Sequence, residues 1–362
     1  MDSIIYPDMS LAAIDAIRLR PAMYIGSTDQ RGMLHLIWEL VANSLDQHLA
    51  GRCTRIEVVL EQDGAVVVDD DGPGIPLDDV DGRCFAEVAL TQFHATPTFD
   101  GHTPHEHVDL HGVGLFPVNA LSSRLTLDVF RDGVHHQQRF ERGKAVSGLE
   151  SLGPTFRTGT RVMFQPDPLI FTDPWYNAGI IAARLRELAC LLPGLTFTFD
   201  DRREHVFHEP RGLRALLERT RSGFVPVAGT LLVDQTIGKI RVEAAIEWLP
   251  CRWSTVESYA NIERTTEGGT HVEGLVDGLA RALRDVVAGW KEKTRKSTTE
   301  AVRRGLHAIV CVRLNDPHYG GPSRNCLGTP EAKTAVSTAV RTAFARFLCD
   351  ADALIKHFSK SE

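Results

Sequence analysis

Long apolar runs and closely spaced cysteine pairs are missing from this sequence, and its first residues lack the pattern of a secretory signal. No run approaches the roughly 18 apolar residues that a membrane-spanning helix needs. The first residues, MDSIIYPDMS, lack the basic region and apolar stretch of a secretory signal. The 7 cysteines are odd in number, scattered and never arranged as CxxC, which argues against a disulfide framework and a zinc site. We therefore expect a cytoplasmic protein with reduced thiols.

Neither sign of charge dominates the sequence. The formal net charge is -7 at pH 7 and 43% of the residues are hydrophobic, which is typical of a soluble globular protein and not of one whose whole surface binds nucleic acid. A length of 362 residues suits two domains. We predict one domain over residues 1–219 and a second over residues 220–362, with a linker at 220–229.

Residue patterns predict a mixed α+β architecture in both parts. Residues 55–68 alternate as two strands around Asp63-Gly64, which predicts a hairpin that delivers Asp70 to the end of a strand. In the first part we expect further strands at 125–130, 135–140, 160–164 and 195–199, and helices at 115–121, 177–192 and 211–217. In the second part we expect strands at 240–246 and 307–312, and helices at 272–290 and 331–348.

The most informative segment is LHLIWELVANSLDQHLAG, residues 34–51. Its apolar residues recur at helical spacing, which predicts a helix with a core face. The opposite stripe presents an imidazole, two carboxylates and an amide: His35, Glu39, Asn43 and Asp46. A solvated face is the alternative, although such a face usually carries lysine or arginine. Hydrolysis of a phosphoanhydride needs a base and a metal, so Glu39 is the candidate base, oriented by His35, and Asn43 the candidate Mg²⁺ ligand.

Two glycine-containing loops follow this helix. Asp70 to Pro76 reads DDGPGIP, in which glycine permits a close backbone approach and a carboxylate can accept a hydrogen bond from the amine of adenine. A tight acidic turn is the alternative. LHGVG at residues 110–114 precedes a predicted helix whose N-terminal amides would suit phosphate. Thr160 offers a hydroxyl near the base pocket, or belongs to an ordinary turn.

A histidine-rich stretch, residues 94–111, follows the first loop and extends into the second, and it also contains Glu106 and Asp109. Zinc sites use such donors. The spacing of the histidines matches no compact two-plus-two pattern, however. We favour a polar lid whose histidines lie near phosphate groups over a dedicated metal site.

The order of these motifs matters more than any one of them. The chain also contains Arg18-x-Arg20-Pro21-x-Met23-Tyr24-Ile25-Gly26 near its start, and Gly268-Gly269-Thr270-His271 and Leu314-Asn315-Asp316-Pro317 in its second part. Nearly end to end, the sequence resembles the N-terminal ATPase and transducer region of the B subunits of DNA gyrase and topoisomerase IV. The resemblance implies a GHKL (Bergerat) ATPase α/β sandwich followed by a ribosomal-S5-domain-2-like transducer domain.

The resemblance also implies a site for ATP and Mg²⁺. Glu39 would be the general base, Asn43 the Mg²⁺ ligand and His35 a supporting neighbour. Asp70 would contact adenine, with Thr160 assisting. The other implied cofactor-binding residues are Gly72, Gly74, Ile75, Pro76, His111, Gly112, Val113, Gly114 and Arg324. Asp46 is a further candidate from the helix stripe, with the alternative that it only completes the polar face of the helix. In that family ATP binding closes a lid and dimerises two protomers through an N-terminal arm, which would be residues 1–10 here.

Several positions depart from the family pattern where phosphate is bound. Thr96-Pro97-Thr98 stands in place of the usual Gly-Gly-Lys, Val108-Asp109 in place of Gly-Gly, and Pro322-Ser323-Arg324 in place of Gln-Thr-Lys. The carboxylate of Asp109 would repel phosphate. Arginine keeps the charge of lysine but not its geometry. These changes predict ATP binding with slow turnover.

Two functions therefore stay open. One is an ATP-gated dimerisation module that hydrolyses ATP slowly, has a gyrase A-like or other topoisomerase partner, and contacts DNA through the eight basic residues between Arg281 and Arg304. A solvated helix and loop is the alternative for that basic segment. The other function is a catalytically impaired paralogue that acts as a nucleotide-dependent regulatory or interaction protein. The cleavage domain of the full-length family members is not in the sequence, so we expect no DNA cleavage by this chain alone.

Two further departures lead to a prediction about inhibitors. Aminocoumarins contact two arginines in the family, and this chain has Pro73 and Gln137 at those positions. We expect novobiocin to bind weakly, because both cationic contacts are lost. Isothermal titration calorimetry should give a dissociation constant well above the nanomolar range, and nanomolar affinity would refute the prediction.

Overall fold

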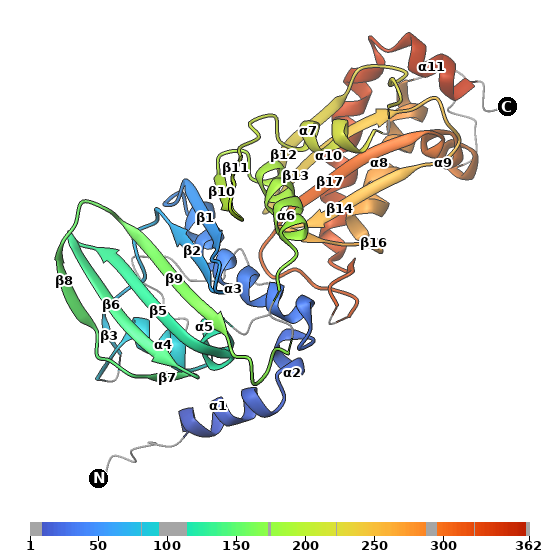
Figure 1. The fold of residues 1–362 in the computed structure, drawn as a ribbon. Coiled ribbons are helices and arrows are strands. Elements are labelled where there is room, and N and C mark those ends of the chain that lie inside the picture. The colour runs from blue at the N-terminus through green and yellow to red at the C-terminus, as the bar shows by residue number, and fades with distance from the viewer. Residues whose placement is uncertain are drawn as a thin grey trace, which may run out of the picture. The chain divides into compact units, whose positions relative to one another are not determined.

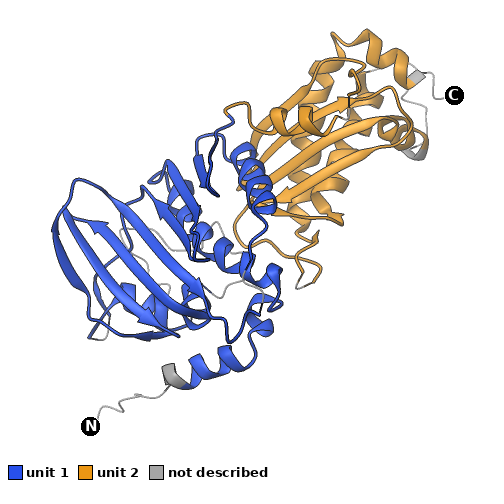
Figure 2. Cartoon of the chain, in the orientation of Figure 1, with its two compact units in different colours: residues 1–209 blue, residues 210–362 orange. Residues whose placement is uncertain are grey.

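The structure is a computed structural model that describes residues 9–80, 82–93, 114–172, 175–221, 223–286, 295–321 and 323–359. The chain divides into two compact units, Met1–Glu209 and Pro210–Glu362 (Figure 2). Each unit combines a sheet with helices, which confirms the predicted α+β class. In the described ranges, no helix has the length and apolar character to cross a membrane.

Unit 1 contains a nine-stranded sheet in the order β11-β10-β1-β2-β9-β5-β6-β7, with β8 paired to β6 (Figure 1). Its strands are β1 (Arg55–Leu60), β2 (Val66–Asp70), β5 (Ser122–Arg131), β6 (Val134–Glu141), β7 (Lys144–Ala145), β8 (Glu150–Pro154), β9 (Gly159–Pro166), β10 (Thr196–Asp200) and β11 (Glu204–Phe207). A separate ladder joins β3 (Asp79–Val80) to β4 (Arg83–Cys84). The helices are α1 (Met9–Leu19), α2 (Ala22–Ile25), α3 (Gln30–Leu49), α4 (Phe85–Thr91), α5 (Leu115–Ala120) and α6 (Ala178–Leu191).

The hairpin of β1 and β2 positions the acidic end of β2. The two strands pair antiparallel, as predicted, and β2 is buried along its whole length. Helix α3 packs against β2. Because side chains alternate along a strand, the last two residues point to opposite faces of the sheet. Asp70 meets Ser44 of α3, whereas Asp69 pairs with Arg157 on the other face.

Unit 2 contains a five-stranded sheet in the order β12-β13-β17-β14-β15. Its strands are β12 (Leu231–Ile237), β13 (Ile240–Trp248), β14 (Thr255–Ala260), β15 (Glu263–Arg264) and β17 (Leu306–Arg313), and β16 (Gly268–Gly269) pairs with β18 (Cys326–Leu327). The helices are α7 (Leu213–Thr220), α8 (Thr270–Val286), α9 (Arg295–Arg303), α10 (Pro330–Leu348) and α11 (Asp352–Ser359). Helices α8 and α10 pack together and share one apolar core with the sheet, in which Trp248 stacks on Phe344.

The division between the units falls earlier than the predicted division after residue 219. Helix α7 packs on β13 and β17 and therefore belongs to unit 2. His307 of β17 lies within hydrogen-bond distance of the Thr220 hydroxyl, and Arg221 binds the buried carboxylate of Glu247. The apolar pattern of α7 predicts a helix with one buried face, but it does not reveal which sheet that face contacts.

Arg18 is the first residue of the Arg18-x-Arg20-Pro21 motif near the start of the chain, and its side chain anchors α1 to the rest of unit 1. Its guanidinium donates to the Ala120 carbonyl at 2.8 Å and to the Asp167 carboxylate at 2.7 Å. Asp167 has no exposed side-chain surface and also accepts from Arg142 at 2.8 Å. A buried carboxylate is stable only when it is paired and hydrogen-bonded, so α1 depends on this contact.

Arg18→Ala should destabilise the protein, because it leaves Asp167 with a single arginine and removes the donor to the Ala120 carbonyl. We expect a cost of about 2 kcal/mol in the free energy of unfolding, measured by urea denaturation. Arg20→Ala is the matched control, since Arg20 lies in the same motif and is exposed. Equal stability of the two variants would contradict this role of Arg18.

Candidate functional site

Three of the four residues in the polar stripe of α3 are buried, and Asn43 is half-buried. His35 is 9% exposed, Glu39 4% and Asp46 1%, so the solvated-face interpretation is wrong for these three residues. A buried carboxylate or imidazole costs free energy unless polar partners surround it. These three residues therefore lie in the interior of unit 1 and not on its solvated surface.

Glu39, His35 and Asn43 form a connected group on consecutive turns of α3. The Nε2 atom of His35 lies 3.2 Å from Oε1 of Glu39. The Nδ2 amide of Asn43 donates to the Glu39 carbonyl at 2.8 Å. Because the nitrogen of that amide faces a carbonyl, the orientation of the group is fixed and its Oδ1 atom faces away. An amide oxygen of this kind is a ligand that Mg²⁺ accepts, so the donor chemistry at Asn43 fits the predicted metal.

Asp70 is the second candidate binding residue whose side chain is held by hydrogen bonds from several elements. Its Oδ2 accepts from the Ser44 hydroxyl at 2.8 Å, and its Oδ1 accepts from the amides of Gly72 at 2.9 Å and Thr160 at 3.2 Å. A carboxylate offers about four lone-pair positions. Three are used by the protein, which leaves capacity for one more donor such as an exocyclic amine.

Burial raises the pKa of the Asp70 carboxyl from 3.8 to about 6, although the bonds from Ser44, Gly72 and Thr160 act in the opposite direction. The carboxylate is therefore held in a desolvated position where its charged form is disfavoured. A ligand donor that satisfies its remaining lone pair would stabilise the charged form.

The turn after Asp70 is shaped by close backbone approaches. Gly74 has φ +79° and a Cβ there would lie 2.9 Å from the Phe130 carbonyl oxygen. A Cβ on Gly159 would overlap the Asp70 carbonyl, so only glycine lets β9 start beside Asp70. The Thr160 hydroxyl accepts from the Ile75 amide at 2.9 Å, which ties the turn to β9. Gly72 and Pro76 lie in the same turn, at residues 70–76.

Sequence reasoning missed the contributions of Ser44 and Gly159. Ser44 holds Asp70 from a helix 26 residues away in the sequence. A serine in an amphipathic helix carries no signal of that contact. In the sequence Gly159 is indistinguishable from the glycine of an ordinary turn, since nothing in its neighbours indicates that a carbonyl passes so close.

Several predicted residues cannot be joined to this group. The N-terminal arm up to residue 8 and the histidine-rich stretch at residues 94–111 lie outside the described residues. The same holds for the phosphate-loop residues His111, Gly112 and Val113, and for the positions that depart from the family pattern at 96–98, 108–109 and Pro322. Gly114 is described and forms the N-cap position of α5 with φ +65°. Arg324 lies in unit 2 with its guanidinium over the Tyr319 ring, and its contact with phosphate stays a prediction. Among the described residues, no group of three or more metal-binding side chains of the His, Cys, Asp and Glu type occurs.

Gln137, at a position where the family usually has an arginine, takes part in a local polar cluster. Its Nε2 donates to Oδ1 of Asp128 at 2.8 Å, and His135 lies 2.7 Å from the same oxygen. Pro73 lies in the turn and is half-buried. Neither residue supplies the positive charge of an arginine.

Comparison with known proteins identifies the family of this chain. Residues 28–168 match the family described as histidine kinase-, DNA gyrase B-, and HSP90-like ATPase, and residues 212–360 match DNA gyrase B. The fold matches the crystal structure of the 43K ATPase domain of Thermus thermophilus gyrase B in complex with an aminocoumarin, with TM-score 0.83 and 34% identity over 96% of this chain and 93% of that chain. The chain belongs to the DNA gyrase B family.

Gyrase B relatives resemble the chain along nearly its whole length. The DNA gyrase B protein of Halalkalibacterium halodurans is 39% identical over 353 residues, and that of Thermotoga maritima is 38% identical over 351 residues. These matches cover 94% and 91% of this chain but 55% and 54% of the relatives. The chain thus spans about half the length of the curated gyrase B proteins that it matches. The topoisomerase IV ATP binding domain of Francisella tularensis is similar in fold, with TM-score 0.80, 26% identity and 96% of each chain covered.

The gyrase B assignment confirms the resemblance and the fold class inferred from the sequence motifs. The ATPase match lies within unit 1 and contains α3, β2 and β9. The DNA gyrase B match begins at residue 212, close to the start of unit 2. The roles of the individual site residues are predictions that require direct tests.

Asp70→Asn should abolish nucleotide binding and leave the fold intact. Asparagine keeps an oxygen for the two amides and can donate to Ser44, but its amide NH₂ cannot serve as the acceptor that an adenine amine requires. Isothermal titration with a non-hydrolysable ATP analogue should show no binding. Retained binding would mean that the site is assigned wrongly.

The same variant should change the pH dependence of stability. The pKa of Asp70 is about 6 in the native protein, above its ordinary value of 3.8, so the native state binds more protons than the unfolded state between about pH 4 and 6. The contribution of Asp70 to stability therefore falls as pH rises through this window. In urea denaturation, Asp70→Asn should gain stability relative to wild type up to about pH 6, and a difference that does not vary with pH would contradict the shift.

Proposed function

We propose that this chain is a module like those of type IIA DNA topoisomerases, which binds ATP and hydrolyses it slowly. We further propose that two copies dimerise when ATP binds. The observation that supports this best is the grouping on α3, where buried Glu39 contacts His35 and Asn43 and where Ser44 holds Asp70. One helix thus carries the candidate base and metal ligand and also fixes the candidate adenine contact.

In the proposed reaction Glu39 accepts a proton from the attacking water. Its burial excludes bulk solvent, and His35 at 3.2 Å orients the carboxylate. Asn43 would hold Mg²⁺ through its Oδ1 atom, and the bound ion would shield the charge of the phosphates. Asp70 would recognise the base of the nucleotide, with the Thr160 hydroxyl assisting.

Slow turnover is the expected consequence of the altered phosphate contacts. Thr98 and Pro322 replace residues that would contact phosphate or position water, and Asp109 adds a negative charge. Arg324 retains a positive charge for the γ-phosphate. Binding energy that is realised only in the transition state raises the catalytic rate, so losses at these positions lower kcat more than they lower affinity.

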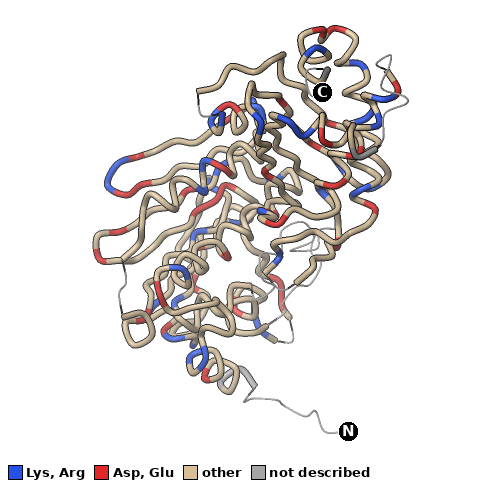
Figure 3. Tube along the Cα trace, turned by 90° about the vertical axis from the view of Figure 1, so that its right-hand side faces the viewer, with Lys and Arg blue, Asp and Glu red and all other residues tan. Residues whose placement is uncertain are grey.

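The proposed partners are a second copy of the chain, a gyrase A-like protein and DNA. Contact with DNA would use the eight basic residues between Arg281 and Arg304. In the described part of α8, Arg281 pairs with Asp277 at 2.8 Å, and Arg341 of α10 pairs with Asp285 at 2.7 Å. Basic and acidic segments are interspersed along the chain (Figure 3), so any DNA contact would be local and strongly dependent on salt.

The alternative is a nucleotide-gated regulatory or interaction protein with no meaningful turnover. The altered positions Thr98, Asp109 and Pro322 favour it. The two functions share the same nucleotide site and differ in whether Glu39 acts on water, so the rate of hydrolysis separates them.

Glu39→Gln should lower the steady-state rate of phosphate release by roughly 100-fold, because an amide cannot act as a general base. Binding of a non-hydrolysable ATP analogue should be retained. Glu61→Gln is the control, since Glu61 is exposed at the end of β1. Equal rates for wild type and Glu39→Gln would exclude the enzymatic function, and analogue-dependent dimerisation in analytical ultracentrifugation would then support the regulatory alternative.

A further inference from the structure

Strand β12 forms one edge of the sheet in unit 2. Strand β12 pairs with β13 along its whole length in unbroken register, from Leu231 opposite Ile246 to Ile237 opposite Ile240. Within the described ranges no strand lies on its other side. Alternate backbone amides and carbonyls of an edge strand point outward and can pair with a further strand.

Strand β12 carries few of the features that usually protect an edge. Such strands are commonly shielded by lysine, proline or a bulge, whereas β12 reads LLVDQTI in regular register. Its one charged residue, Asp234, is engaged by the Arg241 guanidinium at 3.0 Å on the neighbouring strand. Leu232 is 51% exposed. The edge therefore combines available main-chain groups with exposed apolar surface.

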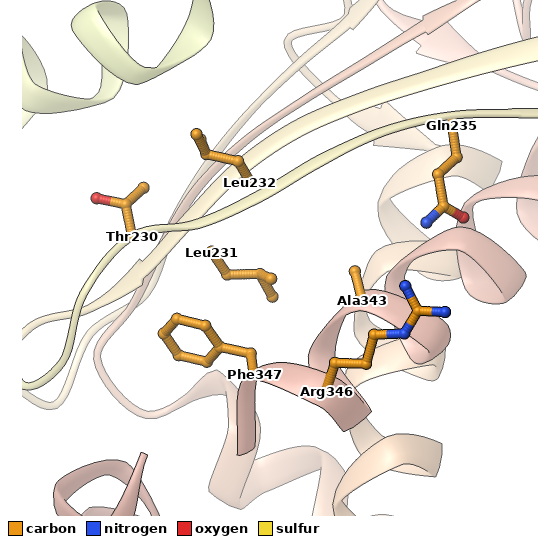
Figure 4. A pocket seen from close by; sticks show the side chains of 7 residues that line it. All are labelled: Thr230, Leu231, Leu232, Gln235, Ala343, Arg346 and Phe347. Atoms are coloured by element: carbon orange, nitrogen blue, oxygen red, sulfur yellow. The ribbon is translucent and has the colours of Figure 1, made fainter. Parts of the chain in front are cut away.

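An open, shallow cavity of about 420 Å³ lies at the surface beside this edge, between β12 and α10. Leu231 and Phe347 line one end of it, and the Gln235 amide and the Arg346 guanidinium lie at the other (Figure 4). Its remaining lining residues are Thr230, Leu232 and Ala343. Arg346 is exposed, and in the described part of the chain no carboxylate pairs with it. The cavity thus offers apolar contact together with an uncompensated positive charge.

We propose that this edge binds an extended peptide segment of another protein, which adds to the sheet as a strand next to β12. Main-chain pairing would supply the contact along the edge, and the cavity would select the side chains. Because side chains of a strand alternate, residues i and i+2 of the peptide face the same side. One would be a large apolar side chain in the cavity, and the other an acidic side chain that pairs with Arg346.

A second copy of this chain fits the edge less well than a foreign peptide. The only acid of β12, Asp234, lies on the strand face opposite to Leu231 and Val233, which point to the core. A second β12 added to the edge would present no acid from its buried face to Arg346. The charge of the cavity therefore favours a segment that carries an acid on the same side as its apolar anchor.

The test begins with a displayed library of random twelve-residue peptides selected on the full chain. Selected peptides should share a large apolar residue followed two positions later by aspartate or glutamate. Their synthetic, fluorescein-labelled forms should bind in fluorescence anisotropy. Methylation of alternate amides on the side that faces β12 should weaken binding by at least about tenfold, whereas methylation of the intervening amides should have little effect.

Two variants of the protein locate the binding. Arg346→Glu reverses the charge and Ala343→Trp fills the cavity, so each should weaken the selected peptides by at least about tenfold. Arg341→Ala is the matched control, because Arg341 lies on α10 but outside the cavity. Thermal unfolding checks that each variant is folded, and Arg346→Glu, at an exposed position, keeps the test valid if Ala343→Trp does not fold.

The proposal is wrong if no selected peptide is weakened by Arg346→Glu. It is also wrong if methylation on either side of the peptide has the same effect, since binding would then not be strand addition. A nucleotide-independent dimer in analytical ultracentrifugation that Leu232→Lys abolishes would make a second copy the occupant. ATP binding and hydrolysis are not involved in any of these measurements, so their result is separate from the proposed function.

Discussion

The relative positions of α3, the turn after β2 and the start of β9 depend on the hydrogen bonds to the buried carboxylate of Asp70. Ser44 of α3, the Gly72 amide of the following turn and the Thr160 amide at the start of β9 all donate to this carboxylate. A buried charge that loses one of its donors costs several times a typical hydrogen bond. The helix, the turn and the strand must therefore keep one relative position. That requirement also keeps Glu39 and Asn43, which lie within about one and a half turns of Ser44 on the same helix, fixed relative to Asp70.

Because side chains alternate along β2, the carboxylates of Asp69 and Asp70 lie on opposite faces of the sheet and have different surroundings. Asp70 faces α3, where burial raises its pKa to about 6, and Asp69 faces the other side, where Arg157 binds both of its oxygens. The first carboxylate keeps capacity for a ligand, whereas the second is satisfied by the protein. Burial also shifts the pKa of a histidine in unit 2. His271 of the Gly-Gly-Thr-His signature is fully buried beside Thr265, and burial lowers its pKa to about 4, so this signature residue maintains the core.

Periodicity predicts the elements that have a clear apolar face, and the remaining elements show why pattern alone is insufficient. The β1–β2 hairpin, α3, α6, α8 and α10 lie where their patterns indicate. Helices α1, α4, α9 and α11 have no counterpart among the predicted elements, whereas the equally short α5 and α7 do, so helix length alone does not decide which helices a pattern reveals. The stripe of Glu39 and Asn43 follows from helical spacing, whereas Ser44 and Gly159 act through contacts distant in sequence. The phosphate role predicted for residues 111–113 rests on a short glycine-containing loop before a helix and on the resemblance, and that of Arg324 rests on the resemblance alone.

The central claim is that one helix and one buried carboxylate bind and orient Mg·ATP. A crystal structure of the chain with Mg²⁺ and a non-hydrolysable ATP analogue tests it most directly. The account predicts that the exocyclic amine of adenine donates to Asp70, that Oδ1 of Asn43 coordinates the metal, and that Glu39 lies beside the γ-phosphate without binding the metal. A nucleotide bound elsewhere, or one whose adenine does not contact Asp70, would contradict the account.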